Sequence, residues 1–309
     1  MRFVGKILVV GSTTVDIVLE VDRLPRREED VLVRDRAMAL GGCAFNAASV
    51  LRGLGEPHEL FCPVGGGPFG DFVRKRFAEL GVATRIPPVA DENGCCYCLV
   101  EPNGERTFIA LHGAEYTFEA AWFDAIDLRD YDMVYVCGFE VEHTSGPVVV
   151  EFMERCAATA RVFFAPGTRV ADLPVALVER ILALHPILHL NGVEAMVAAK
   201  RYLGASPADD RAAARLLCAR TGAPVVMTLG AAGCWYETGA ERGLLPAVPV
   251  QVVDTIGAGD AHAGATMGFL HRGLPLPEAL AQANKVAAAV VGVKGATLPE
   301  GAYSGLFKL

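Results

Sequence analysis

The chain has 309 residues, of which 52% are hydrophobic, so it can bury a large core as one big α/β domain or two smaller ones. Its formal charge is −8 with no block of basic residues, which argues against nucleic acid or an anionic membrane as the main partner. No apolar run approaches the ~18 residues of a membrane helix, and no signal peptide is expected. Nine cysteines without paired spacing favour reduced, mostly buried thiols and a cytoplasmic protein.

The first third of the chain mixes short strands and helices. A buried strand over 7–10 ends at Gly11-Ser12, and a more polar stretch reaching residue 38 contains strand-like segments at 17–21 and 31–33. Gly41-Gly42 opens a helix predicted over 44–54, and an amphipathic helix over 69–80 ends at Gly81. Between 95 and 111, two strands flank Pro102-Asn103-Gly104, which predicts a hairpin.

From residue 131 onward, strands and helices alternate. Strands are expected at 133–137, 162–165, 187–190 and 224–228, with helices at 147–160, 174–184, 193–203 and 208–221 and a small-residue helix at 280–291. Continuous apolar strands in such an alternation predict a parallel sheet with helices on both faces. The β-rich stretches near 13–38 and 92–113 do not fit this layer and are predicted to form one small antiparallel sheet over the active site. No internal repeat or linker appears, so we expect residues 1–309 to form a single domain with a β lid.

One stretch, residues 252–265, carries the chemistry. Gly257-Ala258-Gly259 lets backbone N–H groups converge at the start of a small-residue helix, which is an anion site. Asp260 follows on the first helical turn, where it could take a proton from a hydroxyl that attacks a bound phosphate. The alternative is a glycine-rich turn in which Asp260 is an ordinary helix-start residue.

Residues 254–260 resemble the carboxyl-terminal signature of the ribokinase-like (PfkB) carbohydrate kinases, whose core is Asp-Thr-x-Gly-Ala-Gly-Asp. Residues 41–48 resemble the amino-terminal Gly-Gly signature of the same family. The resemblance implies a three-layer α/β/α domain with a mostly parallel central sheet and a small β lid. It also implies that Asp260 is the general base and that Gly257, Ala258 and Gly259 form the anion hole.

The resemblance places the acceptor sugar beside Asp16, Gly41, Gly42 and Asn46, with Glu140 near a further sugar-contacting carboxylate. The glycines let the backbone approach a sugar, and Asn46 can both donate and accept hydrogen bonds. The alternatives are a solvated hairpin residue for Asp16, a buried turn asparagine for Asn46 and an exposed loop residue for Glu140. Cys43 and Thr14 stand where ribokinase itself has lysine and asparagine, which argues against ribose as the natural substrate.

Two further segments resemble the family's nucleotide site. Asn191 and Glu194 match its Asn-x-x-Glu motif, in which Asn191 would bind a phosphate and Glu194 would act on Mg²⁺ through water. The alternative is a helix cap with asparagine at Ncap and glutamate at N3. Thr228, Gly230 and Gly233 resemble the nucleotide loop, and Asn284 is placed beside the adenine pocket by the resemblance alone.

A monovalent cation, K⁺, is implied next to the anion hole. The resemblance assigns it the side chain of Asp254 and the carbonyls of Ile256, Val290, Val293 and Gly295. Arg106 and Arg169 could contact phosphate or substrate, although surface salt bridges are the favoured interpretation of both. His262 is expected to pack rather than react.

These patterns predict an ATP-dependent phosphotransferase that moves the γ-phosphoryl group to a hydroxyl, expected to be primary, of a sugar or nucleoside. The exposed face of the lid is a candidate homodimer contact. A catalytically silent ligand sensor on the same fold is the alternative. A dinucleotide-dependent oxidoreductase is disfavoured because Gly11-Ser12-Thr13 lacks the required Gly-x-Gly-x-x-Gly pattern. Hydroxymethylpyrimidine-type kinases share the architecture, but Gly41-Gly42 and the lid hairpin favour sugars.

Overall fold

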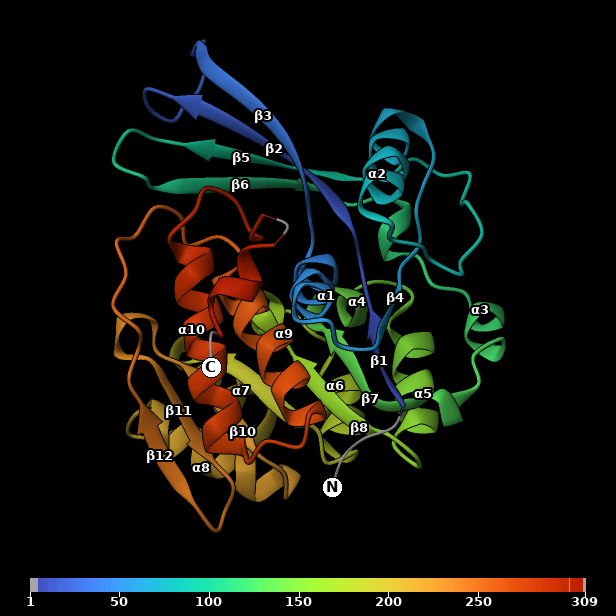
Figure 1. Ribbon diagram of the computed structural model, residues 1–309, viewed down its shortest axis with the longest axis vertical. Coiled ribbons are helices and arrows are strands. Elements are labelled where there is room, and N and C mark those ends of the chain that lie inside the picture. Colours follow the sequence, from blue (N-terminus) through green and yellow to red (C-terminus); the bar gives the residue numbers. More distant parts are fainter. Residues whose placement is uncertain (1–4, 300, 308–309) are drawn as a thin grey trace.

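The computed structural model describes residues 5–299 and 301–307. Its main sheet has the strand order β12-β11-β10-β9-β8-β7-β1-β4, in which the strands from β10 to β4 run parallel and β11 and β12 are added antiparallel (Figure 1). The strands are β1 (Lys6–Val10), β4 (His58–Phe61), β7 (Tyr131–Cys137), β8 (Arg161–Ala165), β9 (Ile187–Asn191), β10 (Val225–Thr228), β11 (Cys234–Glu237) and β12 (Arg242–Leu245).

Helices cover both faces of this sheet because its strands are apolar on both sides. Within β1, Ile7 and Val9 pack with α1, α9 and α10, whereas Leu8 and Val10 pack with α5 to α8. The helices are α1 (Cys43–Leu54), α2 (Gly67–Leu80), α3 (Ala120–Asp124), α4 (Gly138–Glu142), α5 (Gly146–Cys156), α6 (Val175–Leu182), α7 (Gly192–Leu203), α8 (Asp210–Thr221), α9 (Ala258–His271) and α10 (Leu276–Val291). Short 3₁₀ helices are η1 (Ala114–Tyr116), η2 (Leu128–Asp130), η3 (Gly167–Ala171), η4 (Gly230–Ala232) and η5 (Ala302–Gly305). The three-layer α/β/α prediction is confirmed.

A second sheet, the lid, has the order β3-β2-β5-β6 and lies above the ends of α9 and α10 in Figure 1. Its strands are β2 (Thr14–Val21), β3 (Val33–Gly41), β5 (Cys95–Val100) and β6 (Arg106–Leu111). The prediction that this sheet is antiparallel was wrong for its central pair, since β2 and β5 run parallel. Each of these two strands starts at the main domain and runs outward, so they share a direction, and each is then paired with its own antiparallel return strand.

The lid also extends further along the chain than the predicted limit of residue 38. The segment expected at 31–33 is a strand only from Val33, and β3 then continues to Gly41, which pairs with Thr14. The long pairing with β2 holds this segment extended right up to the start of α1. The first glycine of the Gly-Gly pair therefore ends a strand of the lid.

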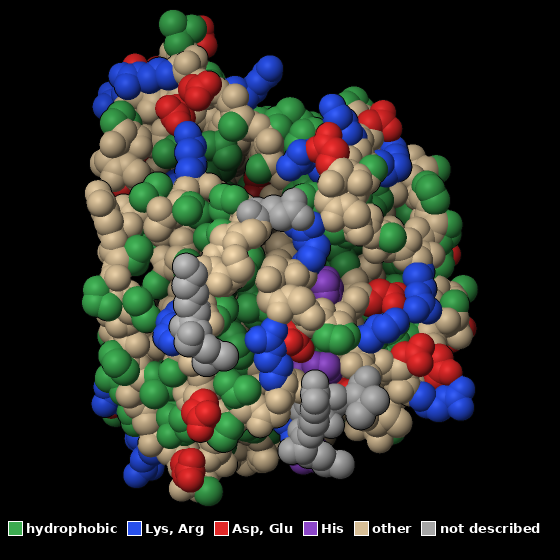
Figure 2. Space-filling view, viewed as in Figure 1, with side chains coloured by type: hydrophobic (Ala, Val, Ile, Leu, Met, Phe, Trp, Pro, Cys, Tyr) green, Lys and Arg blue, Asp and Glu red, His purple; other side chains and the backbone are tan. Residues whose placement is uncertain are grey.

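The molecular surface carries charges of both signs. On the face shown in Figure 2, Lys and Arg side chains alternate with Asp and Glu over the lid and the main domain. All nine cysteines are free, and seven of them are buried. Among the described residues, no helix combines the length and the apolar character needed to span a bilayer.

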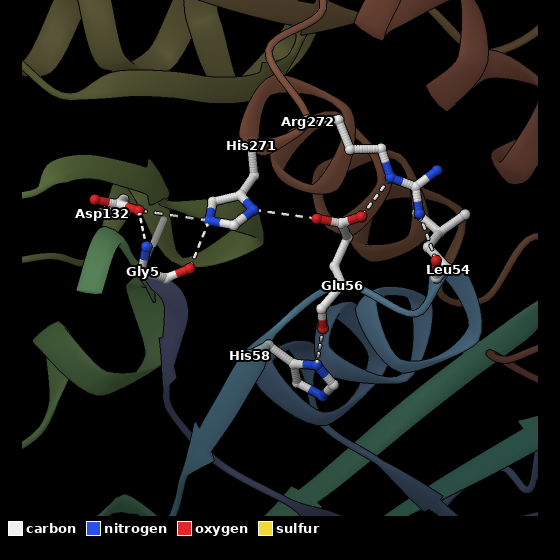
Figure 3. Close-up of polar contacts among 7 residues, drawn as sticks. All are labelled: Gly5, Leu54, Glu56, His58, Asp132, His271 and Arg272. Atoms are coloured by element: carbon white, nitrogen blue, oxygen red, sulfur yellow. Dashed lines mark hydrogen bonds and ion pairs between the residues drawn. The ribbon is translucent and has the colours of Figure 1, made fainter. Parts of the chain in front are cut away.

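A buried polar cluster ties together the amino-terminal ends of β1 and β7 and the carboxyl-terminal end of α9 (Figure 3). The imidazole of His271 lies 3.1 Å from Glu56 Oε2 and 3.0 Å from the carbonyl oxygen of Gly5. Arg272 pairs with the same Glu56, and Asp132 accepts from the backbone N–H of Gly5. This cluster lies at the amino-terminal ends of the strands, whereas the predicted motifs follow their carboxyl-terminal ends. We therefore assign it a role in the fold.

Candidate active site

The glycine loop before α9 has the geometry of an anion site. Gly257 is the Ncap residue of α9 and has φ 71°, a left-handed conformation that favours glycine. A Cβ atom at Gly257 would lie 2.5 Å from the carbonyl oxygen of Ala296, whereas one at Gly259 would meet nothing within 4 Å. The space beside Gly259 is therefore open. The first-turn N–H groups of α9 have no intrahelical acceptor, and that of Ala258 donates to the Thr255 carbonyl oxygen at 3.4 Å.

Asp260 lies on this first turn and is half-buried. A residue of the amino-terminal Gly-Gly signature, residues 41–48, holds its carboxylate. Asn46 Nδ2, from α1, donates to Asp260 Oδ2 over 2.8 Å. Burial raises the pKa of Asp260 to about 6, the hydrogen bonds from Asn46 and Cys43 oppose this rise, and the charges of Asp16 and Glu194 add to it. The other amide atom of Asn46, Oδ1, is buried without a partner among the described residues. Asp260 is thus an ionised carboxylate at neutral pH beside an acceptor that is free for a ligand.

Asp16, on β2, lies beside the Gly-Gly pair at the end of the neighbouring lid strand β3. A Cβ atom at Gly41 would lie 2.2 Å from Asp16 Oδ2, so the absence of a side chain there makes room for this carboxylate. Desolvation raises the pKa of Asp16 to about 6, against a weak lowering by the Thr14 hydroxyl. Gly42 has φ 96° and lies against the Ser12 carbonyl, where a Cβ atom would be 2.6 Å from the oxygen. Asp16 is therefore not the solvated hairpin residue that was the alternative.

Glu140 is fully buried in α4, so its interpretation as an exposed loop residue was wrong. Its Oε1 accepts from the backbone N–H of Ser12 at 2.9 Å, and its Oε2 accepts from Cys137 Sγ at 2.8 Å. Burial raises the pKa of Glu140, and these hydrogen bonds oppose the rise. The carboxylate therefore fixes the turn that follows β1, next to the start of the lid.

A cavity of about 180 Å³ joins Asp260 to the Asn-x-x-Glu segment. Sequence reasoning missed several of its lining residues, among them Tyr135, which lies within β7, and Phe139 and Thr168, which follow β7 and β8. The signal was available in principle, because ligands bind at the carboxyl ends of strands in open α/β sheets. Its lining also includes Cys43, Cys137, Ala165, Gly167, His189, Leu190, Asn191, Glu194, Thr228, Gly259 and Ala263.

Asn191 and Glu194 form the capping box that was the alternative to a functional role. Asn191 Oδ1 accepts from the Glu194 N–H at 2.8 Å, and Glu194 Oε2 accepts from the Asn191 N–H at 2.9 Å. Burial raises the pKa of Glu194, and the bond from the Asn191 backbone opposes the rise. Since both side chains also line the cavity, the cap holds them in place beside it.

Beyond this cavity lies an open groove formed by the ends of β9 and β10. It is lined by Asn191, Gly192, Val193, Met196, Asp209, Asp210, Thr228, Leu229 and Gly230. Gly233 and Asn284 lie outside its lining. Gly233 packs against the Leu245 carbonyl, and the Asn284 amide donates to the carbonyls of Leu245 and Pro246 at 3.3 and 3.0 Å.

Asp254, the predicted cation ligand, is engaged by the protein itself. Its Oδ1 accepts from the Ile256 N–H at 2.7 Å and its Oδ2 from the Gly295 N–H at 2.8 Å. Arg106, from β6 of the lid, forms an ion pair with Oδ1. The favoured interpretation of Arg106 as a surface salt bridge was wrong in one respect, because the side chains of Arg106 and Asp254 are only 14% and 4% exposed. The carbonyl oxygen of Val290, which was also predicted to bind the cation, accepts a hydrogen bond from the Val293 N–H at 3.1 Å.

Two other sequence expectations concern residues near the site. Arg169 forms a partly exposed ion pair with Glu142, as expected of a salt bridge. His262 is buried and contacts His189, with 2.9 Å between Nδ1 and Nε2, and burial lowers its pKa to about 4. It packs, as predicted.

Comparisons with known proteins identify the architecture around this site. The pfkB family carbohydrate kinase model matches residues 4–301. The chain is 36% identical over 289 residues to a protein of Escherichia coli (strain K12) described as the uncharacterized sugar kinase YegV, covering 94% of this chain and 89% of that protein. Ribokinase from Thermotoga maritima superposes with a TM-score of 0.84 at 23% identity, over 98% of this chain and 99% of that one. Arabidopsis thaliana ribokinase, solved with ribose and ATP, gives a TM-score of 0.81 at 21% identity over the whole of both chains. The chain therefore belongs to the pfkB family of carbohydrate kinases and is an ATP-dependent sugar kinase.

Proposed function

We propose that this kinase transfers the γ-phosphoryl group of ATP to a primary hydroxyl of a sugar or nucleoside, with Asp260 as the general base. The observation that carries the proposal is the position of Asp260. It lies on the first turn of α9, hydrogen-bonded to Asn46, and borders the cavity that leads to Asn191 and Glu194. A carboxylate at an anion site is better suited to accept a proton than to bind phosphate.

The acceptor would lie under the lid, between Asp16 and Asn46. The unpartnered Asn46 Oδ1 can accept a hydrogen bond from a hydroxyl, and the Asp16 carboxylate can accept from two. Asp16 pairs with Cys96, and Cys96 pairs with Ala110, so these three side chains share one face of the lid. Phe108 lies two residues before Ala110 on β6 and is therefore on the same face. This half-exposed ring would cover the acceptor and exclude water that would otherwise be phosphorylated.

In the proposed step the hydroxyl oxygen attacks the γ-phosphorus and its proton passes to Asp260. The bond from the γ-phosphorus to the bridging oxygen breaks, and that oxygen leaves with ADP. With its pKa near 6, Asp260 is ionised and ready to accept the proton at neutral pH. The N–H groups at Gly257, Ala258 and Gly259 would stabilise charge on the transferring phosphoryl group.

The nucleotide would occupy the groove beside Thr228 and Gly230, with its phosphates toward Asn191. Mg²⁺ would neutralise charge on the phosphate oxygens. The described residues contain no group of three or more His, Cys, Asp or Glu side chains that could hold a metal, so the ion would be held mainly by phosphates and water. Glu194 fits a role through water, because both of its oxygens already accept hydrogen bonds from Asn191. K⁺ is not part of this proposal, because the Arg106 guanidinium forms an ion pair with Asp254, the predicted K⁺ ligand.

We also propose that two copies associate through the outer face of the lid. Ile109 and Met38 lie in one cross-strand row on the face opposite Asp16, and they are 59% and 41% exposed. Exposed apolar side chains in a row on a sheet are suited to packing against a second copy. The change Ile109→Asp should convert a dimer into a monomer in analytical ultracentrifugation, and a wild-type monomer would contradict the proposal.

The test of the main proposal is ADP release from Mg-ATP across a panel of sugars, sugar phosphates and nucleosides. Turnover with one acceptor, followed by identification of its phosphorylated hydroxyl by ³¹P NMR, would support it. Binding of ATP without turnover on any acceptor would favour the silent sensor.

A further inference from the structure

The ion pair between Arg106 and Asp254 joins the lid to the loop that precedes the anion site. Arg106 is the first residue of β6, and Asp254 lies three residues before the Ncap residue of α9. The two residues are 148 positions apart in the chain, and both side chains are largely shielded from solvent. Burial makes such a pair sensitive to the loss of either partner, since the remaining charge would be uncompensated.

Asp254 organises the anion site through backbone contacts. One of its oxygens receives the N–H of Ile256, which directly precedes Gly257, and the other receives the N–H of Gly295. Ala296, the next residue after Gly295, packs against Gly257 at a distance that leaves no room for a Cβ atom. The position of the loop therefore depends on Asp254 being held as a charge-balanced carboxylate.

The positive charge that balances Asp254 is supplied by the chain. The Asp254 carboxylate would be the only charged ligand of the monovalent cation that the family resemblance implies, the other assigned ligands being carbonyl oxygens. Here one carboxylate oxygen is already shared between the guanidinium and the Ile256 N–H, and the other is taken by the Gly295 N–H. A K⁺ ion on Asp254 would have to share this carboxylate with a like charge, so these residues do not fit it.

We propose that the Arg106 guanidinium replaces the monovalent cation, so that this kinase does not need K⁺. Arg106 is then a positioning residue for the anion site, acting through Asp254. Because Arg106 belongs to the lid, the anion site is charge-balanced only while the lid is in place. The inference rests on the proposed function for its kinetic consequence, but its consequence for ion binding stands independently.

The experiment compares the wild type with Arg106→Ala in potassium chloride and in tetramethylammonium chloride at equal ionic strength. Glu20→Ala is the matched control, since Glu20 also links the lid to this region through an exposed ion pair with Lys294. Phosphotransfer rate and melting temperature are measured for each protein in each salt. Guanidinium ion at low concentration serves as a second probe for rescue.

For the wild type and for Glu20→Ala, the rates in the two salts should agree within about twofold. The melting temperature of each protein should be the same in both salts. Arg106→Ala should lose about tenfold or more in tetramethylammonium, and K⁺ or guanidinium ion should restore a large part of the loss. K⁺ should also raise the melting temperature of Arg106→Ala, because an ion that binds only the folded state stabilises it.

A wild-type enzyme whose rate or melting temperature rises with K⁺ would overturn the inference. So would an Arg106→Ala variant that is fully active without K⁺, or one that neither ion rescues, as expected if Arg106 contacted the substrate instead. If the wild type showed no turnover in any salt, the proposed function would fail. The melting temperatures would then still decide whether Arg106 replaces the ion.

Discussion

Replacing Asp260 with asparagine should stabilise the protein while it disables the reaction. The carboxyl has a pKa of about 6 in the folded protein, compared with an ordinary value of 3.8. A raised pKa in an acid means that the folded state disfavours the charged form. The native protein therefore loses stability as the pH rises from 3.8 through 6, and Asp260→Asn avoids this loss.

The two pKa values give the size of the effect. The charged carboxylate lowers the free energy of unfolding by about 3 kcal/mol at pH 7.5, but by only about 1.5 kcal/mol at pH 5. These are upper values, because Asp260 is only half-buried. Asparagine keeps the shape of the side chain, and its Oδ1 can still accept the bond from Asn46 Nδ2.

The assay is urea unfolding of the wild type and Asp260→Asn at both pH values, without nucleotide. Asp254→Asn is the matched control, since the same substitution there leaves the Arg106 guanidinium unpaired and should destabilise. The reasoning predicts a gain for Asp260→Asn that is larger at pH 7.5 than at pH 5. A loss of stability, or an equal gain at both pH values, would refute it.

Three further predictions concern the reaction. The value of kcat/KM should rise with pH through about 6 as Asp260 loses its proton, and Asn46→Ala should move this midpoint upward by about one unit because a bond to the charged form is lost. A flat profile, or an unmoved midpoint, would contradict the assignment. Gly257→Ala should abolish most activity while Gly55→Ala, also at φ 71° but with open space around it, should only reduce stability by about 1 kcal/mol. Equal activity of the two variants in an ATP-turnover assay would contradict the anion site. Asp16→Asn should raise KM for the acceptor about tenfold and leave KM for ATP unchanged. A rise in both values would show that Asp16 does not act on the acceptor alone.

Much of the main sheet could be predicted because its signals are local. The apolar strands at 133–137 and 187–190 are each followed by a helix with a recognisable start, and this alternation has few architectures compatible with it. The position of Asp260 beside a glycine loop at a helix start could be predicted for the same reason, since these glycines are its immediate neighbours in the chain. Its role as the general base stays a prediction.

Features that depend on distant pairing could not be read from the sequence. The parallel contact between β2 and β5 joins segments about 80 residues apart, and alternation within each segment is the same for either strand direction. Glu140 looked like a loop residue because Ser12, whose N–H donates to its carboxylate in the buried interior, lies 128 positions away in the chain. The burial of Arg106 likewise depends on the packing of the lid against the loop that contains Asp254.

The most direct test of the account is the kinetics of Asp260→Asn with an identified acceptor. ATP affinity should stay within about twofold of the wild type, and kcat should fall by roughly 10²–10⁴, the usual scale for removal of a general base. Asp71→Asn, an exposed aspartate on α2, should change neither value. If Asp260→Asn instead keeps near-normal kcat, Asp260 is not the base and the account of this site is wrong.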